Sequence, residues 1–138
     1  MIEKQPLCPE RLRKIGGSFA FIEHRFLRHG FWSALRHHEL LLYVLLILVA
    51  DRHGLSYYSF DKLCSLLELS LDDYLLARNA LIQKDLIAFD GHLFQVLSLP
   101  SKPVTSPKTP LTHPHQMAQA DPATIRALIR DSLGVQDD

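Results

Sequence analysis

The chain has 138 residues, of which 47% are hydrophobic and 22% charged, and its formal net charge is zero. This composition is typical of a globular domain and excludes a protein that binds nucleic acid through a strong overall positive charge. The longest apolar run, residues 40–50, is too short to cross a membrane, which takes about 20 residues. It predicts a buried helix that is covered on more than one side.

The charges are distributed unevenly along the chain. Residues 1–38 carry seven basic and three acidic side chains, a net charge of +4, whereas residues 39–99 carry four basic and eight acidic ones, a net charge of −4. Any positive surface therefore belongs to the first segment.

The two cysteines, Cys8 and Cys64, lie far apart in the sequence. They predict neither a disulfide scaffold nor a metal-ligand pair, and the N-terminus has no apolar signal-peptide core. We therefore expect a cytoplasmic protein.

Four segments are expected before residue 55. Residues 1–17 are polar and predict a flexible basic arm, and the aromatic and β-branched residues of 18–24 predict a short strand. A short helix interrupted at Gly30 follows. A longer helix from about His37 to Asp51 is expected to end at Gly54 in a left-handed cap.

The pattern from residue 55 to residue 99 predicts a short strand, two helices and a hairpin. Ser59 is the expected N-cap of a helix over 60–67, and Ser70, with Asp73 three residues later, that of a helix over 71–84. The pair Asp90-Gly91 predicts a two-residue hairpin turn with positive φ at both positions, or at least at Gly91.

The composition changes at residue 100. Five prolines predict an irregular linker over 100–120, and residues 121–138 predict a C-terminal helix with Asp121 as its N-cap and an apolar stripe, too small to be stable alone, formed by Ile125, Leu128, Ile129 and Leu133.

The segment "SFDKLCSLLELSLDDYLLARNALIQKDLIAFDGHLFQVLSL" resembles the winged helix-turn-helix superfamily. The preceding residues are similar to winged-helix proteins of bacterial mobile elements and to plasmid replication initiators. The resemblance covers residues 18–99. It implies an α+β winged helix-turn-helix, here with an N-terminal strand and helix, a Pro-rich linker and a C-terminal helix, and a DNA-binding accessory or regulatory role.

The second helix of the bihelical unit allows two interpretations. Helical spacing puts Tyr74, Ala77 and Leu81 on its packed face, and the stem of Arg78 is expected along the core with its head in water. The outward face then carries Leu71, Asp72, Leu75, Leu76 and Asn79. Asn79 is the one base-reading side chain there, and Asp72 would repel phosphate. Three exposed leucines instead favour a protein interface formed by Leu71, Leu75 and Leu76.

The basic first segment is open to interpretation as well. It either binds phosphate or is simply a solvated face, and it can also dock on the acidic bihelical unit of a second copy. If duplex DNA is bound, the expected contacts are Arg25, Arg28, Arg36, Asn79, Lys84 and His92. The alternative is a winged helix that assembles a larger complex, through a protein partner or self-association, without reading DNA.

Catalysis has little support in the sequence. The eight histidines lack metal-ligand spacing, and no nucleophile motif, phosphate loop or pair of catalytic carboxylates is present. We expect no enzyme activity, no cofactor, no metal and no membrane contact.

Overall fold

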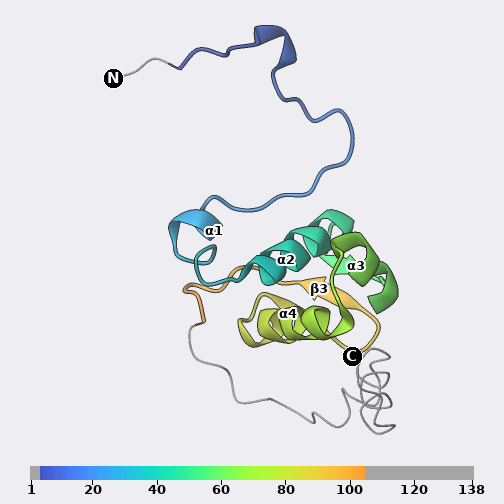
Figure 1. The fold of residues 1–138 in the computed structure, drawn as a ribbon. Coiled ribbons are helices and arrows are strands. Elements are labelled where there is room, and N and C mark those ends of the chain that lie inside the picture. The colour runs from blue at the N-terminus through green and yellow to red at the C-terminus, as the bar shows by residue number, and fades with distance from the viewer. Residues whose placement is uncertain (1–3, 105–138) are drawn as a thin grey trace, which may run out of the picture.

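The computed structural model describes residues 4–104. Its elements are a 3-10 turn at Pro9–Arg11, the helices α1 (Arg25–Arg28), α2 (His37–Val49), α3 (Phe60–Leu67) and α4 (Leu71–Gln83), and the strands β1 (Leu55–Ser56), β2 (Ile87–Phe89) and β3 (Phe94–Val96). The strands form one antiparallel sheet in the order β1-β3-β2. The described chain is therefore α+β, and its first part, before residues 18–23, runs away from the packed helices (Figure 1).

The two helices of the bihelical unit begin where the serines predict. The Ser59 hydroxyl accepts a hydrogen bond from the Lys62 N–H, and the Ser70 hydroxyl accepts one from the Asp73 N–H at 3.1 Å. Glu68 adopts a left-handed conformation (φ 54°) between the helices, which reverses the chain in three residues. Local capping chemistry thus confirms the predicted boundaries within one residue.

The hairpin has a longer loop than the two residues predicted. Phe89 pairs with Phe94, so residues 90–93 form a four-residue loop. Gly91 has a φ of 103°, as expected, but Asp90 does not have a positive φ. Its carboxylate instead accepts the backbone N–H groups of His92 and Leu93, which closes the loop as an Asx turn.

The end of α2 differs from the prediction. The helix stops at Val49, and Ala50, in an extended conformation, is its C-cap, so Gly54 does not cap the helix. Gly54 has a φ of 83° in the turn that leads into β1, where an added Cβ would lie 2.5 Å from the Val96 carbonyl oxygen. Because it has no side chain, Gly54 lets the backbone of this turn lie close to β3.

Residues 18–24 do not form the predicted strand. They carry no strand or helix apart from the turn at His24, and all seven are exposed. Their side chains suit a strand, but in the described chain the sheet ends at β1 and β2 and no strand pairs with this segment. The helix predicted after it is reduced to the single turn α1, with the expected break at Gly30 (φ 91°).

The core lies between α2, α4 and the sheet. Its centre consists of fully buried side chains from these elements and from α3: Leu42, Leu46, Leu63, Tyr74, Leu81, Leu86, Ile87 and Phe94. A second cluster joins α1 to α2, where the Phe26 ring stacks on Tyr43 at 5.1 Å and on Phe31 at 6.1 Å.

The C-terminal predictions fall mainly outside the described residues. Residues 100–104 carry no helix or strand, in agreement with an irregular linker, while the remainder of the linker and the expected helix over 121–138 lie beyond the described chain.

Candidate nucleic-acid and protein interfaces

The outward face of α4 exposes less leucine than the sequence predicts. Leu76 is 70% exposed, but Leu71 and Leu75 are half-buried and pack against the core. The expectation of three exposed leucines is therefore wrong for two of them, because α4 is oriented with Leu71 and Leu75 against the core. Tyr74, Ala77 and Leu81 occupy the packed face, as predicted.

The first turn of α4 and the turn before it are acidic. Glu68 and Asp72 are exposed, and Asp73 is half-buried. These carboxylates suit the positive end of the helix dipole. In a DNA complex, this end of the helix would enter the groove. Its negative charge raises the free-energy cost of approaching the phosphates.

The one cationic side chain of α4 points inward. Arg78 is 3% exposed, and its guanidinium lies over the Phe89 ring at 4.9 Å and near the Tyr74 ring. It donates hydrogen bonds to the side-chain oxygen of Asn79 at 3.2 and 3.4 Å. The prediction that the Arg78 head lies in water is wrong, and the amide oxygen of Asn79 has a partner within the chain.

Lys84 is also committed to the fold. Its ammonium group donates hydrogen bonds to the Ala34 carbonyl oxygen at 2.8 Å and to the carboxylate of Glu39, which is buried in the first turn of α2. This ion pair fixes the end of α4 to the start of α2. The contact of Lys84 with the DNA backbone stays a prediction, and the structure shows its charge already paired with Glu39 within the domain.

Arg25 has a similar internal role. Its guanidinium donates to the carbonyl oxygens of Leu99 and Pro100 at 2.8 and 2.9 Å and pairs with Glu23 at 2.8 Å. It also lies over the Phe31 ring at 5.6 Å. Arg25 thus connects the segment after β3 to α1, and each of its three nitrogens donates one hydrogen bond within the chain.

The other predicted DNA contacts are exposed but scattered. Arg28 lies on α1, Arg36 precedes α2, and His92 is in the hairpin loop. Arg36 lines a small cavity of about 320 Å³ together with Asp73 and Leu76, so a carboxylate accompanies it. Of the three, only Arg36 lies beside the exposed Leu76 of α4, and Arg28 and His92 do not line that cavity.

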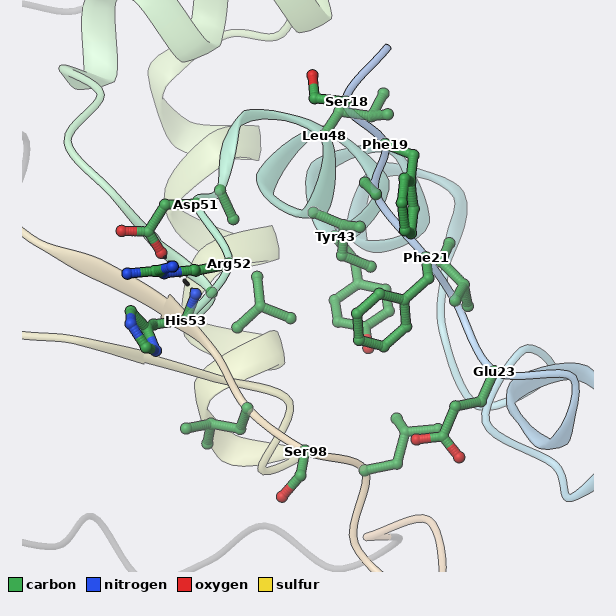
Figure 2. A pocket seen from close by; sticks show the side chains of 18 residues that line it. Ser18, Phe19, Phe21, Glu23, Tyr43, Leu48, Asp51, Arg52, His53 and Ser98 are labelled. Carbon is green, nitrogen blue, oxygen red and sulfur yellow. Dashed lines mark hydrogen bonds between the residues drawn. The ribbon is translucent and has the colours of Figure 1, made fainter. Parts of the chain in front are cut away.

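A groove on the described part of the domain was not predicted from the sequence. A groove of about 740 Å³ lies between the extended residues 18–23, the second half of α2, the turn 50–54 and residues 96–99 (Figure 2). Phe19 and Phe21 are 68% and 74% exposed along one wall, and Leu48 of α2 is 66% exposed beside them. The apolar run over 40–50 was expected to be covered on more than one side, but the described residues leave this face open.

Titratable groups near the groove and the hairpin have shifted pKa values. Burial, followed by the negative charge of Glu23, raises the pKa of Tyr43 to about 12, so this groove side chain stays neutral. Hydrogen bonds from the backbone N–H groups of Leu93 and His92 lower the pKa of Asp90. Those from Leu55 and His53 do the same for Asp51 in the turn before β1.

Neither a metal-binding cluster nor a membrane-spanning helix is found among the described residues. Within residues 4–104, no three or more His, Cys, Asp and Glu side chains gather where they could hold a metal ion. No helix in the same part of the chain is long and apolar enough to cross a membrane. Comparison with known proteins adds no assignment, because no protein-family model, curated protein or solved structure matches this chain.

Proposed function

We propose that this chain is a winged-helix protein that assembles a larger complex through protein contacts and does not read DNA with α4. The order α2, β1, α3, α4 and hairpin, with β1 paired to β3 at one edge of the sheet, supports the winged-helix assignment. An origin in a bacterial mobile element stays a prediction from the sequence resemblance.

One observation carries the proposal. The arginine of α4 and the lysine at its end, of which only Lys84 was predicted to contact DNA, both have partners inside the fold, while carboxylates occupy the exposed start of the helix. Arg78 is buried and Lys84 is paired with Glu39. A protein that binds duplex DNA gains most of its affinity by neutralising phosphates with exposed Lys and Arg, and α4 exposes none.

The exposed apolar side chains favour protein contact. Four large side chains that line the groove, and Leu41 of α2, which does not line it, are between two-fifths and three-quarters exposed: Phe19, Phe21, Ile22, Leu48 and Leu41. A contiguous apolar patch of several hundred Å² is typical of a protein interaction site. We call these five side chains the apolar surface.

A salt titration tests the proposal. Fluorescence anisotropy with a labelled 30-base-pair random duplex, between about 50 and 200 mM salt, is expected to show affinity no tighter than non-specific binding and a shallow salt dependence. Submicromolar binding with a slope that corresponds to four or more phosphates would overturn the assignment. The variant Asp72→Lys supplies a matched control, because it adds a cation to α4 and should increase the affinity.

DNA binding through the N-terminal segment is the second candidate. The side chains of Arg11, Arg13, Lys14, Arg28 and Arg36 are exposed and precede the acidic part of the chain. In that case, the triple variant Arg11→Ala, Arg13→Ala, Lys14→Ala would flatten the salt slope by roughly three phosphates. Under the favoured proposal the same variant leaves DNA affinity unchanged within error.

A further inference from the structure

Residues 18–22 have the sequence of a strand but no strand beside them. The segment is extended and exposed, and within the described chain no backbone hydrogen bond involves Ser18 to Ile22. An unpaired row of backbone donors and acceptors with β-forming side chains is a template for pairing with another strand. The missing partner explains why the strand expected from the sequence is not present.

The three central residues of this segment, Phe19-Ala20-Phe21, are symmetric about Ala20, whereas Ser18 and Ile22 at its ends differ. Phe19 and Phe21 flank it, and in an extended chain these two side chains point to the same face. If the segment pairs antiparallel with an identical copy, Phe19 lies opposite Phe21 of the partner and Ala20 lies opposite itself. A two-fold interface requires such self-complementarity.

The surroundings of the segment fit a second copy. Figure 2 shows Phe19 and Phe21 on the wall of the groove, with Leu48 and Tyr43 of α2 across from them. Four phenylalanine rings from two copies would meet there, in contact with the α2 helices of both. Nothing charged lies between Ser18 and Ile22, so the central contact buries no unpaired charge.

The available area is adequate for a dimer. Two of the five side chains of the apolar surface are aromatic, with about 150–250 Å² each, and three are aliphatic and somewhat smaller, so together their exposed fractions offer on the order of 500 Å². A standard interface buries about 800 Å² on each partner. The backbone of residues 18–22 and the groove rim supply the remainder.

We propose that a second copy of this chain docks on the apolar surface, with residues 18–22 of the two copies paired antiparallel about a two-fold axis at Ala20. This inference rests on the proposed assembly function and names its partner. Pairing satisfies the backbone groups of the segment and covers the outer face of α2.

Solution mass is the first test. Light scattering on the full chain should give twice 15.8 kDa at micromolar concentration. The double variant Phe19→Ser, Phe21→Ser should weaken self-association by about 100-fold, since rings at the centre of an interface carry most of the binding free energy. Leu48→Ser should weaken it less, and the matched control Leu76→Ser, on the equally exposed α4 leucine, should leave the dimer unchanged.

Cysteine cross-linking tests the register even if a serine variant folds poorly. In a Cys8→Ser, Cys64→Ala background, Ala20→Cys should form a disulfide-linked dimer under mild oxidation, because directly opposed residues have Cβ atoms about 4.5–5.5 Å apart. Ser18→Cys alone should cross-link poorly. An equimolar mixture of Ser18→Cys and Ile22→Cys should cross-link efficiently, and Tyr57→Cys, exposed elsewhere, should not.

The outcomes separate this inference from the proposed function. A monomer at 100 μM, or an oligomer that is indifferent to both phenylalanines, overturns the inference. A monomer that dimerises once residues 105–138 are deleted also overturns it, because the chain's own C-terminal part then covers the surface. None of these results restores DNA reading by α4, which only the salt titration tests.

Discussion

The outer faces of α2 and α4 differ in what they expose. On α4 the exposed side chains are mainly polar or acidic, with Leu76 the exception, and its arginine is turned inward. On α2 the outer face carries the exposed Leu41 and Leu48, and Leu48 lines the groove together with the unpaired residues 18–22. A helix does not form the contact surface merely because it belongs to the bihelical unit of α3 and α4. The exposed side chains decide this, and here they favour α2, outside that unit, as the protein-contact surface.

The largest expected effect is on the α2 side of this comparison. Gly54→Ala should lower the free energy of unfolding by about 3 kcal/mol, because the left-handed backbone disfavours a Cβ and the Val96 carbonyl oxygen occupies its place. Urea denaturation measures the change. Gly16→Ala, where nothing lies within 4 Å, is the control and should stay near zero. Equal stability of the two variants would mean that the turn does not shape the groove wall.

The next effect tests whether the cation at the end of α4 belongs to the core. Lys84→Met should destabilise the domain by about 2–3 kcal/mol, because the buried Glu39 carboxylate loses its partner. Lys62→Met, on an exposed side chain, is the control. A drop in DNA affinity without loss of stability would show that Lys84 contacts DNA and does not stabilise the core.

A smaller effect is expected at α1. Arg25→Ala removes the hydrogen bonds to the carbonyl oxygens of Leu99 and Pro100 and should cost about 1–2 kcal/mol. The exposed Arg28→Ala should change stability by less than about 0.5 kcal/mol. Thermal unfolding of the two variants side by side distinguishes the structural arginine from the solvated one, and similar melting points would contradict the assignment.

The smallest effect concerns the hairpin loop and depends on pH. The pKa of Asp90 is lowered in the folded state, so its stabilisation is present above its ordinary value of 3.8 and is lost as the pH falls through the folded value. Asp90→Ala should therefore be less stable than the wild type at pH 6, by less than about 1 kcal/mol, and the difference should vanish near pH 2. A difference that grows on acidification would show that another group closes the loop.

The sequence by itself determined the local structure. The caps Ser59 and Ser70 and the spacing of Tyr74, Ala77 and Leu81 depend on contacts within a few residues, so they are readable without the fold. The glycine in the hairpin loop is readable for the same reason, although the length of the loop is not, because the Asp90 carboxylate competes with the two-residue turn. The left-handed conformation of Glu68 between α3 and α4 was not predicted.

Only the tertiary structure decided which charged and apolar side chains remain available. Arg25 and Lys84 bind partners that are 74 and 45 residues away in the sequence. Arg78 is buried over the ring of Phe89 in β2. Leu71 and Leu75 pack against the core. Residues 18–22 have strand chemistry, but a strand also needs a neighbour, and the described fold places none beside them. Strand pairing and side-chain burial each depend on two segments that are distant in the sequence, so the spacing of residues within one segment cannot determine them.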